Sequence, residues 1–176
     1  LNEKNIEKIQ SSYEIIILNK IKYLSPQEQE LFRNINFFNK SFNTHFDMKN
    51  KRLYISCLKF EKENQKTAFA TAIRFIKNLN IKDIKIDILQ SKKELKIQTI
   101  IEGLILGNYE FLRYKSEKNE EKTKNIQISI ASSKKEKAKL EADLKKALII
   151  CNSMNYTKDI VNSSPDDYYP QIMAND

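Results

Sequence analysis

The chain has 176 residues, of which 40% are hydrophobic and only two are glycine, and its formal net charge is +8 at pH 7. This length suits one globular domain, and since neither an apolar run of about 18 residues nor a cationic and then apolar leader is present, we expect a cytoplasmic protein without a membrane span or signal peptide. Two glycines cannot supply the closely spaced glycines of a dinucleotide fingerprint or a P-loop, which excludes nucleotide binding through such loops.

The first third of the chain predicts two strands of a sheet with a short helix between them. The apolar, β-branched run Tyr13–Leu18 is typical of a strand covered on both faces. Ser25, followed by proline and acidic or amide residues, indicates the start of a helix that ends at about Arg33. The Asn- and Phe-rich stretch Asn34–Asn50 is predicted to be an irregular loop, whose aromatic residues anchor it to the core or, as the sharper alternative, bind a ligand. Arg52–Leu58 is predicted to be the second strand.

The rest of the chain predicts helices that alternate with strands. Apolar residues at helical spacing between Thr67 and Leu79 indicate an amphipathic helix. Alternating isoleucines at positions 84, 86 and 88 indicate a strand near an edge of the sheet, and the same pattern recurs at positions 126, 128 and 130. A long helix is predicted from Lys92 to about Arg113, and another from near Ser133 to Asn162.

The order of these elements indicates the fold class. Strands that alternate with helices of this length imply an α/β fold, a three-layer αβα sandwich with a mixed, mostly parallel central sheet. Cys57 and Cys151 lie far apart in apolar patterns, so we expect them to be buried and reduced rather than joined in a disulfide or a redox pair.

No group of residues in the sequence forms a credible catalytic or metal-binding constellation. His45 is the only histidine, and no pair of histidines or cysteines has the spacing of metal ligands. Asp166 and Asp167 are adjacent in a turn-forming cluster, which favours capping or solvation over metal binding. Ser163 and Ser164 lack the glycines of a nucleophile elbow. We therefore expect no catalytic residue, metal ligand or cofactor in this chain.

Both glycines of the chain lie four residues apart in one predicted helix. Gly103 and Gly107 therefore share a helix face, although glycine costs a helix interior about 1 kcal/mol relative to alanine. Such a pair indicates that the sheet or a neighbouring helix passes too close for a Cβ atom.

Two segments of the sequence are recognisable: EGLILGNYEFLRYKS at residues 102–116 and KDIVNSSPDDYYP at residues 158–170. Both resemble the N-terminal domain of the leucyl aminopeptidase (cytosol aminopeptidase) family. The family-motif residues of the first segment are Gly103, Gly107, Tyr109, Phe111 and Tyr114. The second segment links two domains in the family, and its hinge residues are Lys158, Asp159, Asn162, Pro165 and Pro170. Lys158, Ser164 and Asp166 stand where the family usually has arginine, proline and asparagine.

The resemblance implies a macro-domain-like fold for residues 1–157, with the hinge and the start of a missing catalytic domain at residues 158–176. It implies that the parent protein is an enzyme, a metallopeptidase that hydrolyses N-terminal, preferably leucine-like residues from peptides with two divalent metals, zinc or manganese. In this family the metal ligands and catalytic side chains lie in the C-terminal domain, beyond Asp176, and the assembly is typically a homo-hexamer. This chain alone is then an inactive scaffolding or regulatory domain whose partner is its own catalytic domain.

The alternative hypothesis is a basic nucleic-acid-binding module. The charge of +8 favours attraction to polyanions, and some members of the resembled family also bind DNA. Only four of the 31 basic residues are arginine, however, and the lysines are interleaved with glutamate and asparagine, which is typical of a solvated basic surface. A binding module should gather its lysines on one face. The best candidates lie in the last long helix: Lys134, Lys135, Lys137, Lys139, Lys145 and Lys146.

Overall fold

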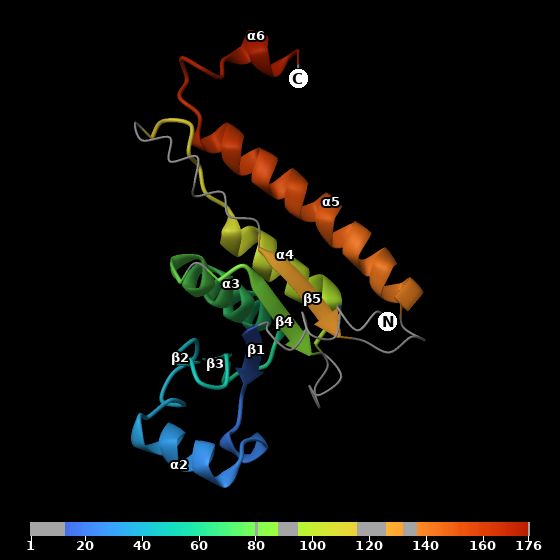
Figure 1. The fold of residues 1–176 in the computed structure, drawn as a ribbon. Coiled ribbons are helices and arrows are strands. Elements are labelled where there is room, and N and C mark those ends of the chain that lie inside the picture. Colours follow the sequence, from blue (N-terminus) through green and yellow to red (C-terminus); the bar gives the residue numbers. More distant parts are fainter. Residues whose placement is uncertain (1–12, 80, 88–94, 116–125, 132–136, 176) are drawn as a thin grey trace.

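The computed structural model describes residues 13–79, 81–87, 95–115, 126–131 and 137–175 (Figure 1). Its elements, in chain order, are β1 (Tyr13–Leu18), the 3-10 helix η1 (Ile21–Tyr23), α2 (Pro26–Asn34), β2 (Thr44–Asp47), β3 (Arg52–Ser56), α3 (Lys62–Asn78), β4 (Asp83–Asp87), α4 (Ile97–Asn108), β5 (Gln127–Ala131), α5 (Lys137–Asn162) and α6 (Pro170–Met173). Most strands and helices alternate along the chain, as the sequence predicts.

The strands form one five-stranded, mixed and mostly parallel sheet in the order β2-β3-β1-β4-β5. Among the described strands, β2 alone is antiparallel to its neighbour. β1 lies in the middle of the sheet, as its continuous apolar sequence predicts. β4 lies beside the edge strand β5, and its Ile84 and Ile86 are buried. The α/β fold class with a mixed, mostly parallel sheet is therefore confirmed.

β1 and β4 are paired over a short stretch and then diverge. Within the described residues their register joins Tyr13 to Ile84 and Glu14 to Lys85, whereas β1 stays paired with β3 as far as Leu18. The chain leaves β1 toward β3 through α2 and leaves β4 toward β5 through α4, so these two connections run in opposite directions. The carboxyl ends of β1 and β4 therefore flank a topological switch point of the sheet.

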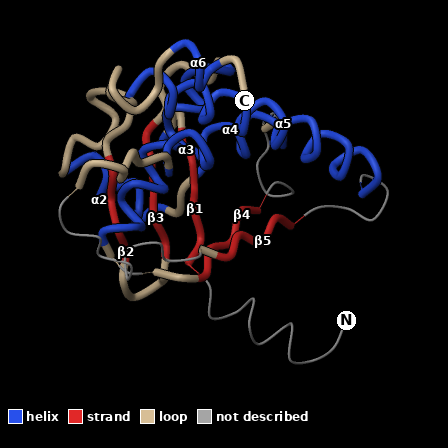
Figure 2. The backbone as a smooth tube through the Cα atoms, turned by 90° about the horizontal axis from the view of Figure 1, so that it is seen from above, coloured by secondary structure: helices blue, strands red, loops and turns tan. Residues whose placement is uncertain are grey.

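Helices cover both faces of the sheet and create two cores. α3 and α4 pack on the face toward which Leu53 and Ile55 point, and α5 lies on the outer side of α4 (Figures 1 and 2). Because side chains alternate along a strand, the residue between them points to the other face, which α2 covers. The core on that face consists of Leu18, Phe32, Phe37 and Tyr54. The three layers are thus unequal. Cys57 and Cys151 are both buried, and neither forms a disulfide with another described residue, as expected.

The two glycines of α4 allow this helix to pack closely on α3. A Cβ atom at Gly103 would lie 2.6 Å from the carbonyl oxygen of Lys66, and one at Gly107 would lie 2.5 Å from Cα of Ala70. Neither distance leaves room for a side chain, so the predicted close packing is confirmed and the close neighbour is α3.

The stretch that the sequence predicts as an irregular loop contains the edge strand β2, so that part of the prediction is wrong. Pairing with β3 supplies the backbone hydrogen bonds of β2, and this tertiary effect is not visible in four residues of mixed character. The anchoring role of the aromatic residues is confirmed, since Phe37 is 2% exposed and Phe46 stacks on Tyr13 with ring centroids 5.5 Å apart. His45 packs edge-on against Phe32.

The helix limits predicted from periodicity are partly wrong. α3 begins at Lys62, in a polar turn that precedes the predicted start and carries no apolar period. α4 ends at Asn108, before the predicted end, since Tyr109 has an extended backbone with ψ 132°. α5 ends at Asn162, as predicted. The helix starts predicted at positions 92 and 133 and the isoleucine at position 88 lie outside the described residues.

Candidate functional site at the domain junction

The two segments that carry the family resemblance meet beside the C-terminal end of α5, and we call this set of contacts the junction. Figure 1 shows the chain after α4 running toward that end of α5, and α6 lying beyond it, away from the sheet. α4 brings its last turn there because α5 packs along it, with Ala147 and Cys151 buried. Residues that are about 50 positions apart in sequence thus become neighbours.

Tyr109 is the centre of the first set of contacts. Its hydroxyl donates a hydrogen bond to Asp159 Oδ1 at 2.8 Å and accepts one from Asn162 Nδ2 at 3.3 Å. The ammonium group of Lys158 lies over its ring, 4.8 Å from the centroid. Partial removal from water, together with the Asp159 carboxylate, raises the pKa of the Tyr109 hydroxyl, which keeps it protonated as a donor. Three of the five predicted hinge residues therefore contact one family-motif residue.

Tyr114 is the centre of the second set of contacts. Its hydroxyl oxygen accepts a hydrogen bond from the Ser164 backbone N–H at 2.6 Å, and its ring meets Phe111 edge-on with centroids 5.4 Å apart. Nearby, Arg113 Nη1 donates to Ser163 Oγ at 2.9 Å. These bonds hold the first residues of the turn that follows α5, so they set the direction in which the chain leaves the helix.

The remaining residues selected from the sequence lie outside this contact network. Gly103 and Gly107 seat α4 on α3, one to two turns before the junction. Pro165 is exposed in the turn after α5, and Pro170 is the first residue of α6. Arg113 was not predicted from the sequence to be a site residue, and no contact was predicted for Ser163 and Ser164. The only sequence signal for these three residues is that they lie inside the two resembled segments. A contact between residues 50 positions apart leaves no local pattern in the sequence.

The second half of α5 presents apolar side chains to the solvent. Ile149 is 69% exposed and Val161 is 76% exposed, and Met154 and Tyr156 are also exposed. α4 covers one side of this helix. Exposed apolar side chains on several other sides are typical of a helix that other parts of a protein or assembly contact. Tyr109, Tyr114 and their partners thus join two distant segments of the chain at this end of α5.

Comparisons with known proteins agree with this geometry. Residues 56–118 match the family model "Cytosol aminopeptidase family, N-terminal domain". A probable cytosol aminopeptidase of Campylobacter jejuni is 29% identical over 181 residues, which cover 100% of this chain and 37% of that protein. Over its whole length the chain is thus similar to the N-terminal part of a cytosol aminopeptidase. A Sulfurihydrogenibium protein, also a probable cytosol aminopeptidase, is 36% identical over 107 residues, or 59% of this chain and 21% of that protein.

Solved structures show the same fold for this chain. A mutant of tomato leucine aminopeptidase superposes with a TM-score of 0.69 at 16% sequence identity, covering 95% of this chain and 39% of that chain. The bottromycin maturation enzyme BotP superposes with a TM-score of 0.68 at 11% identity, covering 93% of this chain and 35% of that chain. The domain thus spans little more than a third of the length of these relatives.

Proposed function

We propose that this chain is the non-catalytic N-terminal domain of a leucyl-type metalloaminopeptidase and that its junction positions the catalytic domain. The observation that carries the proposal is the contact between the two resembled segments through Tyr109 and Asp159. Residues 1–157 form the scaffolding domain, and residues 158–176 form the hinge and the start of the catalytic domain. The parent enzyme hydrolyses N-terminal, preferably leucine-like residues from peptides.

In this proposal α5 acts as a rigid arm between the two domains. The hydrogen bonds of Tyr109 and Tyr114 connect the C-terminal end of α5 to the segment after α4. The two glycines of α4 allow α4 to pack closely on α3, which lies on the sheet. The exposed apolar residues of α5, such as Ile149 and Val161, then contact the catalytic domain or other subunits of a homo-hexamer. A fixed arm lets the N-terminal domain set the spacing of catalytic domains without contributing to the chemistry.

The two divalent metals of the parent, zinc or manganese, belong to the catalytic domain in this proposal. Among the described residues, no group of three or more His, Cys, Asp or Glu side chains is arranged to hold a metal ion. When bound, the metals activate a water and polarise the scissile carbonyl. The residues of this chain act on that chemistry only through the position of the arm.

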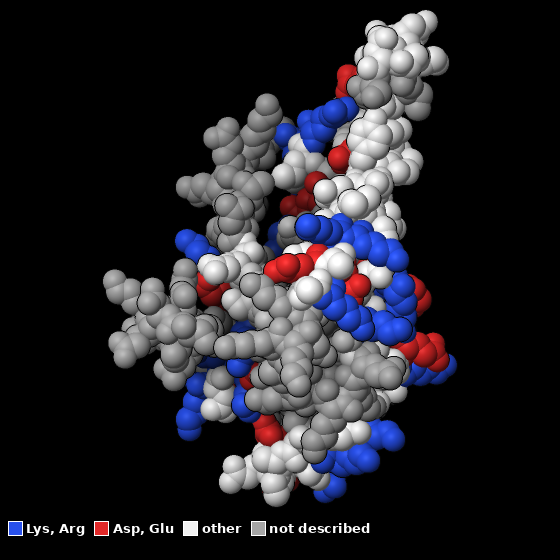
Figure 3. All heavy atoms as spheres, turned by 90° about the vertical axis from the view of Figure 1, so that its right-hand side faces the viewer, with Lys and Arg blue, Asp and Glu red and all other residues white. Residues whose placement is uncertain are grey.

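The charge pattern on the one face drawn in Figure 3 does not favour a nucleic-acid-binding module. On the face drawn in Figure 3, Lys and Arg are interspersed with Asp and Glu and do not form a continuous basic surface. No described helix is long and apolar enough to cross a membrane. We place the parent enzyme in the cytoplasm by analogy with the relatives named cytosol aminopeptidase.

The test compares the parent enzyme with variants of the junction. Asp159→Asn and Tyr109→Phe weaken or remove the hydrogen bond that holds the end of α5. Each should lower by about tenfold or more either the metal-dependent release of leucine from leucine p-nitroanilide or the fraction of hexamer in analytical ultracentrifugation. Tyr169→Phe, at an exposed tyrosine just before α6, is the control and should change neither. Unchanged activity and assembly in both junction variants would contradict the positioning role.

A further inference from the structure

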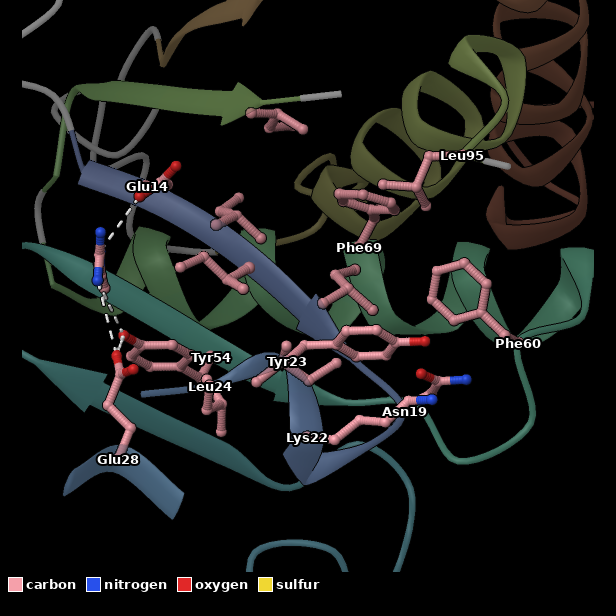
Figure 4. A pocket seen from close by; sticks show the side chains of 16 residues that line it. Glu14, Asn19, Lys22, Tyr23, Leu24, Glu28, Tyr54, Phe60, Phe69 and Leu95 are labelled. Carbon is pink, nitrogen blue, oxygen red and sulfur yellow. Dashed lines mark hydrogen bonds and ion pairs between the residues drawn. The ribbon is translucent and has the colours of Figure 1, made fainter. Parts of the chain in front are cut away.

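A pocket opens at the switch point where β1 and β4 diverge. Its volume is about 380 Å³ (Figure 4). The residues that line it include Asn19, which follows β1, Phe60, which follows β3, and Leu95, which precedes α4. In open α/β sheets, ligands bind in the crevice outside the carboxyl ends of the strands at such a point. This volume lies in the range of small-molecule sites, which run from about 300 to 1,000 Å³.

About half of the pocket wall is apolar. Ile17 and Ile86 line it from the sheet, Phe69 lines it from α3, and Phe60 and Leu95 line it from the segments before α3 and α4. Figure 4 shows Phe69 and Leu95 on one side and the ring of Phe60 beside Asn19. Such a wall favours a ligand that buries an apolar group of a few carbon atoms.

Asn19 lines this pocket and carries an unused hydrogen-bond acceptor. Its Oδ1 atom is buried and has no hydrogen-bond partner within the described part of the chain. A buried acceptor without a donor costs free energy, and native structures rarely keep one without a reason. A turn of the Asn19 side chain toward the pocket would bring this atom to the N–H donor of a ligand and would remove that cost.

Charges divide the pocket into two ends. At one end Arg52 lies between Glu14, at 3.3 Å, and Glu28, at 3.6 Å, so these charges are already paired. At the other end, near Asn19, lies Lys22, whose ammonium group is 5.4 Å from the centroid of the Tyr23 ring (Figure 4). No ion pair within the described ranges involves Lys22. The end of the pocket near Asn19 and Lys22 therefore suits a ligand with an anionic group.

We propose that this pocket binds a small apolar amino acid as its zwitterion. The ammonium group donates to Asn19 Oδ1, the carboxylate pairs with Lys22, and the side chain packs against the wall that includes Phe60, Phe69 and Leu95. An apolar amino acid is the smallest common ligand that unites an N–H donor, an anion and an apolar group on one carbon atom. The inference stands on the pocket alone and does not depend on the proposed function of the parent enzyme.

The probe is L-leucine, titrated against the 176-residue chain in thermal unfolding and isothermal calorimetry. This chain can be tested by itself because both hydrophobic cores consist of its own residues. Leucine should give a saturable calorimetric isotherm and should raise the midpoint temperature steadily with its concentration L, since a ligand that binds only the folded state stabilises it by RT ln(1 + L/Kd). Leucinamide, 4-methylpentanoate and glycine, which lack the carboxylate, the ammonium group and the side chain respectively, should each bind about tenfold or more weakly.

Two variants with matched controls locate the binding. Asn19→Leu should weaken leucine binding about tenfold or more without lowering the midpoint temperature of the free protein, because it removes an unsatisfied acceptor. Asn155→Leu removes the other such acceptor, on α5, and should leave binding intact. Lys22→Gln should weaken binding of leucine but not of leucinamide, and Lys20→Gln, which is outside this pocket, should change neither.

Three outcomes would overturn the inference. The first is the absence of saturable binding by leucine, isoleucine and phenylalanine. The second is binding that is equally strong in the Asn19→Leu variant and the wild-type chain, which would place the ligand elsewhere. The third is saturable binding of adenosine without binding of leucine, which would assign the pocket to a flat ring rather than to an amino acid.

Discussion

Glu28 shows how one side chain can join a local helix signal to the tertiary fold. Its Oε2 accepts a hydrogen bond from the Ser25 backbone N–H at 2.9 Å, which completes the capping box of α2. Its Oε1 accepts one from the Tyr54 hydroxyl at 2.6 Å and lies 3.6 Å from Arg52 Nη1. Burial and the bond to Glu28 raise the pKa of Tyr54 to about 12, so Tyr54 stays a donor at neutral pH.

We expect the free energy of unfolding of the Glu28→Gln variant to depend less on pH below about pH 4.5 than that of the wild-type protein. Burial raises the pKa of Glu28, but the hydrogen bonds from Tyr54 and Ser25 and the charge of Arg52 outweigh it, so the folded-state pKa lies below the ordinary value of 4.5. A lowered pKa stabilises the folded state above about pH 4.5, and this contribution is lost as the pH falls through the folded-state pKa.

Urea midpoints measured by circular dichroism between pH 7 and pH 3 test this expectation. The wild-type midpoint should fall more steeply below about pH 4.5 than that of Glu28→Gln, which should be less stable at pH 7. Glu30→Gln, at an exposed position of the same helix, is the control and should keep the wild-type profile. Parallel profiles for all three proteins would show that Glu28 does not supply this contribution.

Gly107→Ala should destabilise the fold although alanine is the better helix former. The new Cβ would lie 2.5 Å from Cα of Ala70, and backbone cannot move aside as a flexible side chain can. Overpacking of this kind costs about 1 to 3 kcal/mol, which exceeds the gain of about 1 kcal/mol in helix propensity. Denaturant unfolding measures the loss, with Asn152→Ala on the exposed side of α5 as the control. An equal or higher midpoint for Gly107→Ala would show that the two helices can separate at little cost.

At the scale of elements, those with a clear apolar pattern were predictable from the sequence. The strand limits of β1 follow its own residues, and the start of α2 follows Ser25 and Pro26. β2 was not predictable because its strand conformation depends on pairing with β3. Phe42, just before β2, has a positive φ of 69°, and no glycine in the sequence indicates this conformation. The end of α4 was missed because Tyr109 turns away to bond with α5, a contact with no local signal.

The candidate sites divide in the same way. The junction could be located from two resembled segments, since family motifs carry contacts that periodicity does not. Its individual bonds, such as that of Arg113 to Ser163, needed the packing of α5 on α4. The pocket could not be found from the sequence at all, because a switch point exists only once the strand order is known.

Tyr114→Phe should loosen the end of α5 without unfolding the domain. The lost hydroxyl is the acceptor for the Ser164 backbone N–H at 2.6 Å, and Tyr114 is itself exposed and outside both cores. Hydrogen exchange should therefore quicken about tenfold at Ser164 and its neighbours, because protection there depends on local opening, while the midpoint temperature stays the same. Tyr169→Phe is the control and should leave this exchange unchanged. Unchanged exchange in Tyr114→Phe would show that this bond does not hold the turn.

The surface charge is a property of the whole molecule. The chain carries a net charge of +8, yet its basic groups are interspersed with acidic ones on the face seen in Figure 3, and several are paired, such as Lys77 with Glu110 at 3.0 Å. Lys139, Lys145 and Lys146 of α5 are exposed, whereas Lys134 and Lys135 lie outside the described residues. A coat of this kind attracts a polyanion by its net charge and not by a shaped surface.

We therefore expect duplex DNA to bind weakly, with a dissociation constant of about 10⁻⁴ to 10⁻⁶ M at physiological salt and little dependence on sequence. Diffuse attraction is screened by salt, whereas recognition of base edges or DNA shape persists, so binding at low salt alone decides nothing. Fluorescence anisotropy at 50 and 150 mM salt, with Lys139, Lys145 and Lys146 changed together to Gln as the comparison, distinguishes the two cases. Submicromolar, sequence-selective binding at 150 mM salt that the triple variant loses would favour a nucleic-acid-binding function over the scaffolding role, because only a shaped site on α5 could produce it.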